Sequence, residues 1–294
     1  MDPVIWSDRP TLRRPVVVAA FKGWNDAGES ATAALGFLIE SFGAEEFASI
    51  DPEEFFDFTA IRPTITLAEG RERRIEWPAN TFFGAEVPGA DCDLVLLQGM
   101  EPSTRWRAFT EAVVDVAQQV EASMIVTLGA LLSDLPHSRP TTITGFATED
   151  GLVERLGLER SSYEGPTGIV GILHSACAGS EFPSASLWAS VPHYVAATPN
   201  PRAALALIRH FEGVAGVAVD ATDLEEAATD YDRQVNAAVA SDPDVKAFVE
   251  RLEQTLDESE EEEAAAAEER IPSADSIARE FQRFLRQRGE GPQG

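Results

Sequence analysis

The amino-acid sequence predicts an α/β protein with a mostly parallel sheet and helices on both of its faces. Short apolar runs rich in β-branched residues alternate with helical patterns from Val16 to Phe211, and this alternation is typical of strand–helix–strand units. After about Asp220 the pattern becomes purely helical. We therefore expect an α/β core domain over residues 1–220 and a helical C-terminal appendage over residues 221–294.

The first unit illustrates the pattern. Residues 16–21 (VVVAAF) form a continuous apolar run of the kind found in buried parallel strands. The polar turn GWNDAG follows at 23–28, and residues 29–41 place apolar side chains along one side of a helix. Further strands are expected at 93–97, 124–128, 141–146 and 185–189, and further helices at 106–119, 168–177 and 202–211.

Two regions depart from this alternation. Residues 64–67 and 74–77 flank the polar stretch AEGRER and predict an antiparallel hairpin. In the appendage, the acidic, alanine-rich segment 257–269 holds eight acids and no base, and we expect it to be flexible. Helices are expected around it, at 224–240, 245–256 and 273–286.

The composition limits the classes of function and location. The formal net charge is −27, from 23 basic and 50 acidic residues. Phosphate binding needs clustered Lys and Arg, so this charge argues against nucleic acid as a partner. No apolar run reaches the ~18–20 residues of a membrane span, and the first residues lack the apolar stretch of a secretory signal. The two cysteines, Cys92 and Cys177, make no disulfide framework. We therefore expect a cytoplasmic protein without membrane contact.

The chemically informative residues lie in loops that follow the predicted strands. In open parallel sheets such loops meet at one edge, where ligands usually bind. We expect a candidate pocket at this edge, formed by Trp24, Asn25, Asp26, Glu101, Arg105, Trp106, Asp134, His137, Arg139, Tyr163, Glu164, His193 and Tyr194.

The polar groups of this set also have structural explanations. Asn25 or Asp26 can cap the helix that follows, and this explanation is favoured. Asp134 can orient His137 in an acid–base pair. The prolines that flank these residues favour instead a rigid loop in which Arg139 and Asp134 form an ion pair.

The sequence holds no specific catalytic, metal or cofactor motif. GWNDAG lacks the glycine spacing of dinucleotide-binding turns and the Lys-Ser/Thr pair of phosphate-binding loops. A metal shared by His137 and His193 with Asp134 or Glu164 has no supporting spacing such as HExxH. No Gly-x-Ser-x-Gly elbow marks a nucleophile. We therefore expect neither a cofactor nor a metal.

Several longer stretches carry a family resemblance. They are FKGWNDAGESA, LLQGMEPSTRWRAF, LGALLSDLPHSRP, SSYEGPTGIVGILH, SLWASVPHYVAATPNPRAALALI and the terminal SIAREFQRFLRQR. In this order they resemble the proteasome assembly chaperone 2 family, and most closely its actinobacterial branch, from about Val16 to Arg288. The resemblance implies a three-layer α/β/α sandwich with a mixed sheet, like that of nucleoside phosphorylases and peptidyl hydrolases. It also implies a homo-oligomer, with a trimer as the expected size, and it supplies no catalytic residues.

Two functions follow from these observations, and the sequence favours the first. In the first, the chain is a non-enzymatic assembly or interaction protein with proteasome subunits as possible partners. Residues 276–288 support it, since Ile277, Phe281, Phe284 and Leu285 lie at helical spacing and can dock on a neighbour or on the chain's own core. In the second, the chain is a hydrolase, a phosphorylase-like enzyme or a small-ligand-binding protein. Its site would draw on Asp26, Glu101, Asp134, His137, Arg139, Glu164 and His193.

Overall fold

The structure is a computed structural model, and it describes residues 3–68, 72–158, 160–195 and 199–270. The chain divides into two compact units, residues 1–241 and residues 242–294. Helix α6 therefore groups with the α/β core, whereas we expected a boundary near residue 220.

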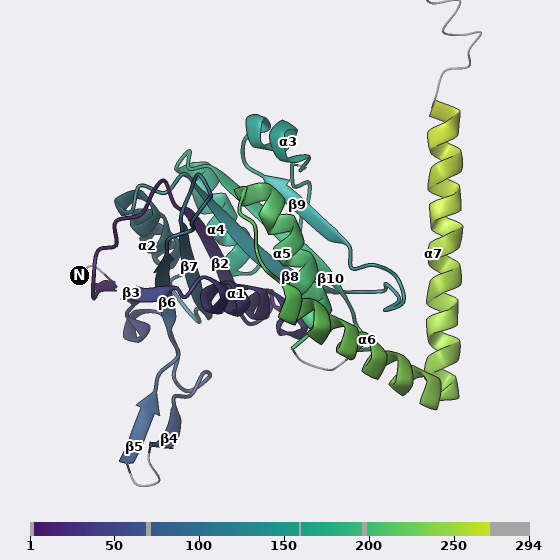
Figure 1. Cartoon of the computed structure of the whole chain (residues 1–294), viewed down its shortest axis with the longest axis horizontal. Coiled ribbons are helices and arrows are strands. Elements are labelled where there is room, and N and C mark those ends of the chain that lie inside the picture. Colours follow the sequence, from purple (N-terminus) through teal and green to yellow (C-terminus); the bar gives the residue numbers. More distant parts are fainter. Residues whose placement is uncertain (1–2, 69–71, 159, 196–198, 271–294) are drawn as a thin grey trace, which may run out of the picture. The chain divides into compact units, whose positions relative to one another are not determined.

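The larger unit is built on an eight-stranded mixed sheet (Figure 1). Four neighbouring strands, β7-β2-β8-β10, run parallel, and antiparallel strands extend both edges to give the order β1-β3-β6-β7-β2-β8-β10-β9. The strands are β1 (Val4–Trp6), β2 (Val16–Lys22), β3 (Glu45–Ile50), β6 (Asn80–Ala85), β7 (Leu94–Met100), β8 (Met124–Ser133), β9 (Ile143–Ala147) and β10 (Ser184–Pro192).

Helices cover both faces of this sheet. Successive side chains of a strand point to opposite faces, so Val18 and Ala20 of β2 pack with one helical layer while Val17 and Ala19 pack with the other. The first layer holds α1 (Ser30–Ser41) and α5 (Pro201–Ala215), and the second holds α2 (Trp106–Gln119) and α4 (Ile169–Gly179). The predicted three-layer α/β/α sandwich with a mostly parallel mixed sheet is confirmed.

Two strands are longer than the sequence pattern indicated. We placed the residues from Gly129 to Ser133 and from Ser190 to Pro192 in loops, but they continue β8 and β10. The two strands pair in register over these stretches, from Trp188 with Gly129 to Pro192 with Ser133. Backbone pairing therefore extends past the buried apolar runs that had defined the strands. Strands β1, β3 and β6 and the short helix α3 (Asp150–Leu156) were also not predicted.

The predicted hairpin is present as a separate two-stranded sheet. Strands β4 (Thr64–Ala68) and β5 (Glu72–Glu76) pair antiparallel, with Ile65 opposite Ile75. The hairpin extends away from the sandwich (Figure 1). Its base is held by the ring of Trp77, which contacts Phe58 edge-on at 4.9 Å between centroids.

Helix α6 (Thr222–Ser241) and helix α7 (Pro243–Arg270) follow the core. Along α7 the backbone stays helical through the acidic segment 257–269, which we expected to be flexible. The helix expected at 273–286 lies outside the described residues. None of the helices described here combines the length and the apolar character that a bilayer span requires.

Candidate functional site

The carboxyl ends of the four parallel strands lie at one edge of the sheet. Strands β7, β2, β8 and β10 are neighbours in that order and end at Met100, Lys22, Ser133 and Pro192. The loops that follow them therefore leave the sheet side by side, as the sequence predicted. They form two groups of contacts, one around Asp26 and Glu101 and one around His137.

Asp26 holds the start of helix α1. Its Oδ1 accepts hydrogen bonds from the backbone N–H groups of Ala31 at 2.8 Å and Thr32 at 3.2 Å, and its Oδ2 accepts from the Thr32 hydroxyl. Burial raises the pKa of Asp26 above its ordinary value of 3.8, although these hydrogen bonds act against the shift. The side chain is 6% exposed, so this carboxylate satisfies helix donors rather than facing a substrate.

This role of Asp26 predicts a graded effect of substitution. Asp26→Ala leaves the buried N–H of Ala31 and the half-buried N–H of Thr32 without their acceptor, and we expect the free energy of unfolding to fall by about 2–3 kcal/mol. Asp26→Asn keeps one acceptor oxygen, and its loss should be about 1 kcal/mol or less. The pKa of Asp26 is higher in the folded state than in the unfolded chain. The wild type therefore loses stability as the pH rises from 3.8 to the folded-state pKa, whereas Asp26→Asn should show no such loss over this pH range. Urea unfolding between pH 4 and pH 7 measures both effects, and equal losses for the two variants would contradict the capping role.

Glu101 lies where a parallel-sheet enzyme would bind an anion. Its Oε1 accepts the backbone N–H of Ile169, the first residue of α4, at 2.9 Å. A Cβ at Gly168 would come within 2.0 Å of Asn25 Oδ1 and 2.8 Å of Glu101 Oε1, so a larger residue there would displace these two side chains. Helix N-termini attract phosphate and carboxylate. Here the Glu101 carboxylate occupies the N-terminus of α4. It would repel a phosphate group, so this helix end is unfavourable for phosphate binding and therefore for phosphorolysis.

His137 joins three separate segments. Its backbone N–H donates to the Tyr194 hydroxyl at 2.7 Å, and its ring Nδ1 lies 2.7 Å from the same oxygen. Its Nε2 lies 3.2 Å from Asn236 Oδ1 on α6. Since the amide oxygen can only accept, Nε2 donates to it, and in the neutral ring Nδ1 then accepts from the Tyr194 hydroxyl. Both ring nitrogens are thus engaged within the protein, in contrast to a general base open to substrate.

Asp134 pairs with a different histidine from the one we expected. Its Oδ1 lies 3.1 Å from His193 Nδ1, and both side chains are exposed. The His137 ring lies against Tyr194 and Asn236, and the Arg139 backbone carbonyl accepts from Arg202. This arrangement ties the end of β8 to the end of β10, where the His193 backbone N–H also donates to the Ser133 carbonyl.

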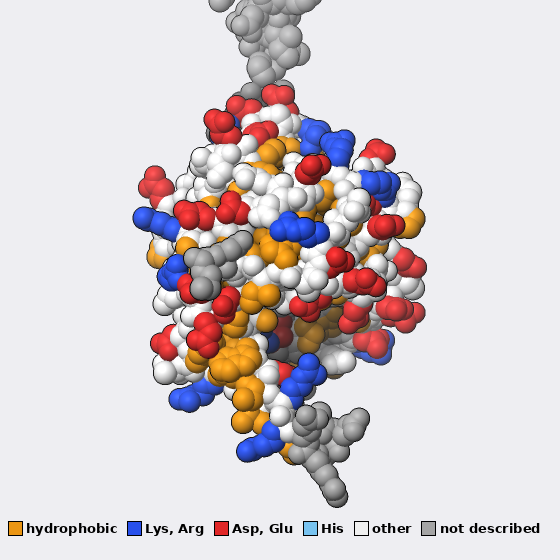
Figure 2. Space-filling view, turned by 90° about the vertical axis from the view of Figure 1, so that its left-hand side faces the viewer, with side chains coloured by type: hydrophobic (Ala, Val, Ile, Leu, Met, Phe, Trp, Pro, Cys, Tyr) orange, Lys and Arg blue, Asp and Glu red, His pale blue; other side chains and the backbone are white. Residues whose placement is uncertain are grey.

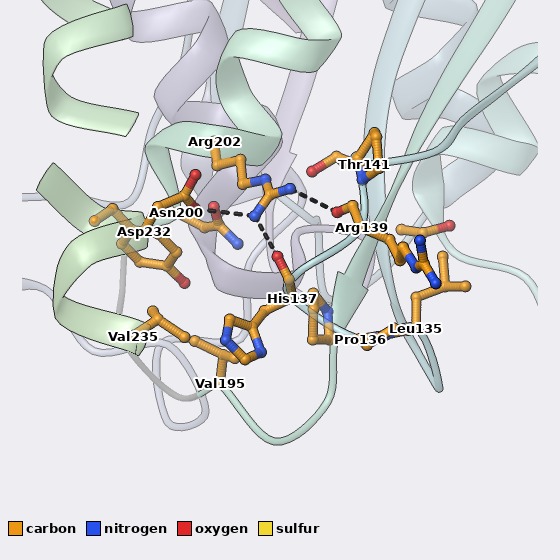
Figure 3. A pocket seen from close by; sticks show the side chains of 14 residues that line it. Leu135, Pro136, His137, Arg139, Thr141, Val195, Asn200, Arg202, Asp232 and Val235 are labelled. Carbon is orange, nitrogen blue, oxygen red and sulfur yellow. Dashed lines mark hydrogen bonds and ion pairs between the residues drawn. The ribbon is translucent and has the colours of Figure 1, made fainter. Parts of the chain in front are cut away.

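Arg202 organises this second group and was not predicted. From the first turn of α5 it donates to the backbone carbonyls of His137 and Arg139 and forms an ion pair with Asp232 at 3.0 Å (Figure 3). Its side chain is 23% exposed. Arginine can serve several acceptors at once because its guanidinium has five donors in a fixed plane. The position carried no sequence signal, since an arginine near a helix start is usually a solvated surface residue.

The hollow beside Arg202 is small. Residues of the loops after β8 and β10, of α5 and of α6 line it (Figure 3), and it offers about 20 Å³ of space to solvent. A cavity of this size holds about one water molecule, whereas ligand pockets commonly reach ~300–1,000 Å³. In the described part of the chain, no group of three or more His, Cys, Asp or Glu side chains is placed to bind a metal ion.

The remaining predicted residues lie around these two groups. Arg105 forms an ion pair with Glu54 and lies over the Phe55 ring, and the Trp106 indole N–H donates to the Pro102 carbonyl. Glu164 is exposed. Trp24 and Tyr163 are 58% and 65% exposed, and the Tyr163 hydroxyl donates to the Pro166 carbonyl within its own loop. The thirteen candidate residues therefore do not converge on one pocket.

Large apolar side chains are exposed at the same edge. Leu131 and Leu132 near the end of β8 are 45% and 63% exposed. The preceding residue, Ala130, bridges to Asp26, and its N–H donates to the Asn25 carbonyl. Asn25 and Gly168 lie close together. Trp24 directly precedes Asn25, and Tyr163 lies on the segment that leads to Gly168. We call Trp24, Leu131, Leu132 and Tyr163 together the edge patch. Leu131 and Leu132 are successive residues of β8, so their side chains point to opposite faces of the sheet.

Comparison with known proteins agrees with this architecture. The sequence profile described as the PAC2 family matches residues 20–239. A search of curated proteins found no match. A PAC2 family protein from Streptomyces avermitilis is 42% identical, with 80% of this chain and 99% of that chain covered and a TM-score of 0.75.

Two further solved structures carry names that refer to the proteasome. A Mycobacterium tuberculosis proteasome-assembly chaperone homologue is 41% identical over 80% of this chain and 99% of that chain, with a TM-score of 0.73. An archaeal proteasome activator from Pyrococcus furiosus is 17% identical, covers 80% of this chain and 97% of that chain, and has a TM-score of 0.64, so it shares the fold. The profile match over most of the chain and the two close structures lead to one conclusion: this chain belongs to the PAC2 family.

Proposed function

We propose that this chain is a non-enzymatic assembly chaperone that binds protein subunits, with proteasome subunits as its partners. The observation that carries the proposal is the contrast at the sheet edge. The predicted acid–base residues Asp26, Glu101 and His137 are engaged inside the protein, while the edge patch exposes large apolar side chains.

Exposed aromatic and aliphatic side chains of this kind suit protein recognition. Aromatic residues are enriched in interface centres. Trp24 and Tyr163 lie on loops, where a partner can reach them from outside the sandwich. The solvent space of about 20 Å³ beside Arg202 is by contrast too small for a nucleoside or a peptide.

The name of a close relative supports the class of partner that we propose. The Mycobacterium tuberculosis protein that is 41% identical is described as a proteasome-assembly chaperone homologue, and we carry that partner class over to this chain as part of the proposal. We further propose that the chain works in the cytoplasm as a homo-oligomer, with a trimer as the expected size, and that it does not bind nucleic acid.

Binding of purified proteasome α-subunits tests the proposal. We expect Leu131→Ser combined with Leu132→Ser to weaken capture of α-subunits at least tenfold, because the pair removes apolar area from the edge patch. Ile5→Ser is the matched control, since Ile5 is 54% exposed on the edge strand β1, outside the edge patch. Titration by biolayer interferometry gives the affinities.

Three results would overturn the proposal. They are an absence of α-subunit binding by the wild type, an equal loss for the Ile5 control, or unchanged binding in the double variant. Deletion of residues 270–294 tests separately whether the basic terminal stretch contributes to capture, as its apolar spacing suggests.

A further inference from the structure

The Glu101 carboxylate is only half used within the chain. Its Oε1 accepts the backbone N–H of Ile169 at 2.9 Å. Among the described residues, no hydrogen bond or ion pair uses its other oxygen, Oε2. A Cβ at Gly23 would lie 3.3 Å from this oxygen, so Oε2 lies beside the loop that carries Trp24. Glu101 is half-buried, and its carboxylate therefore offers a free acceptor at the sheet edge.

A second unsatisfied acceptor lies next to this carboxylate. Asn25 is 3% exposed, and its Oδ1 has no hydrogen-bond partner in the part of the chain that the structure describes. A Cβ at Gly168 would come close to both Asn25 Oδ1 and Glu101 Oε1, so the two side chains approach the same point. Buried polar atoms normally have a hydrogen-bond partner. Because both groups are acceptors, the ligand that suits them brings N–H donors, and the carboxylate favours a positively charged one.

The basic side chains of the same loops are already paired. Lys22, the last residue of β2, places its Nζ 3.0 Å from Glu29 Oε1. Arg105, the residue before α2, forms an ion pair with Glu54. Figure 2 shows acidic side chains spread over one face of the molecule, and the whole chain carries a net charge of −27. Glu101 therefore keeps its negative charge available, on a surface that attracts basic partners.

Two exposed aromatic rings lie on the segments that adjoin this carboxylate. Trp24 follows Gly23, which contacts Glu101, and its side chain is 58% exposed. Tyr163 lies on the segment before α4, is 65% exposed and is followed by the exposed Glu164. The faces of aromatic rings attract cations, and tryptophan does so most strongly. The surroundings of Glu101 thus combine negative charge with rings on which a cation can stack.

We propose that Glu101, Trp24 and Tyr163 form a recognition site for an arginine side chain of the protein partner. A guanidinium has five donors in one plane and stacks on aromatic rings, so it can use both the carboxylate and the rings. Charge complementarity adds selectivity to the apolar contacts of the edge patch. This inference rests on the proposed function, because it names the chemistry that the edge patch selects in its partner.

Two peptides test the charge directly. One is an N-acetylated, C-amidated pentapeptide with arginine at its centre and leucine on both sides of it, and the other carries citrulline, the neutral isostere of arginine, at the centre. In calorimetric titrations of the purified full chain at low ionic strength, we expect the arginine peptide to bind about fivefold more tightly. Equal binding of the two peptides, or no binding of the arginine peptide, would overturn the site.

Glu101→Gln separates the charge from the support of α4. Its amide oxygen can still accept from Ile169, but the negative charge is lost, and we expect the preference for the arginine peptide to fall to about twofold or less. Trp24→Leu keeps an apolar side chain without the ring and should weaken binding of the arginine peptide about threefold. Glu40→Gln is the matched control, since Glu40 is exposed near the C-terminal end of α1. An unchanged preference in Glu101→Gln, or an equal loss in Glu40→Gln, would refute the site.

Capture of α-subunits distinguishes this inference from the proposed function. We expect Glu101→Gln to weaken capture about fivefold at low salt, and added salt to weaken capture by the wild type more than capture by Glu101→Gln. If the wild type and Glu101→Gln capture α-subunits equally well, the edge patch binds by apolar contact alone, so the arginine site is refuted while the proposed function stands. If α-subunits are not captured but Glu101→Gln abolishes the preference for the arginine peptide, the proposed function fails while the arginine site is supported.

Discussion

Phe109→Ala should lower the free energy of unfolding by about 4 kcal/mol. Phe109 of α2 is fully buried, and its ring contacts Phe21 of β2 and Phe55, both edge-on, at 5.7 and 5.4 Å between centroids. Truncation leaves a cavity where the sheet, α2 and the segment before the hairpin meet. The cost combines the lost burial of the ring with the unfilled space.

The measurement is urea unfolding followed by tryptophan fluorescence. All five tryptophans lie between Trp6 and Trp188, so the signal reports on the larger unit. Phe109→Leu keeps most of the volume and should cost only about 1 kcal/mol. A loss below about 1.5 kcal/mol for Phe109→Ala would show that this part of the core is not closely packed.

Asp93→Ala should cost about 3 kcal/mol of unfolding free energy. The Asp93 side chain is 1% exposed and accepts from the Arg13 guanidinium at 2.6 Å. It also accepts from the backbone N–H groups of Arg13 and Val87, at 2.6 and 3.0 Å. Its removal leaves these donors without an acceptor and releases the segment before β2. Asp91→Ala is the control, because Asp91 is exposed and its loss should be close to zero.

The stabilisation by Asp93 should depend on pH. Burial by itself would raise the pKa of Asp93, but the hydrogen bonds from Arg13 and Val87 outweigh it and hold the pKa below its ordinary value of 3.8. A lowered pKa stabilises the fold above 3.8, and this contribution is lost as the pH falls through the folded-state pKa. The difference between wild type and Asp93→Ala should therefore shrink below about pH 4. A constant difference from pH 7 to pH 3 would contradict the ionised role of this carboxylate.

Local patterns predicted the core units well. The apolar run at Val16–Lys22 and the helix at Trp106–Gln119 were found almost as expected, because buried strands and amphipathic helices are encoded by neighbouring residues. The pattern failed where burial changes along a strand. Leu131 and Leu132 are exposed but still paired with β10, so backbone pairing with β10, and not burial, sets the end of β8.

The sequence predicted at which edge of the sheet the candidate residues lie, but it did not predict which side chains contact one another. The loops meet at the predicted edge because β7, β2, β8 and β10 are parallel neighbours. The expected capping by Asp26 agrees with its hydrogen bonds to Ala31 and Thr32. The partner of Asp134 and the part played by Arg202 depend on loops that only the strand order brings together.

The sequence by itself determined the α/β class, the hairpin, the acidic charge and the resemblance to the family to which the chain belongs. These properties reside in local periodicity, composition and ordered motifs. Only the tertiary structure decided that His137 is held by Tyr194 and Asn236, and that the hairpin exposes its apolar face. The physical reason is distance along the chain: a contact between residues 99 positions apart, as for His137 and Asn236, depends on how the strands are ordered.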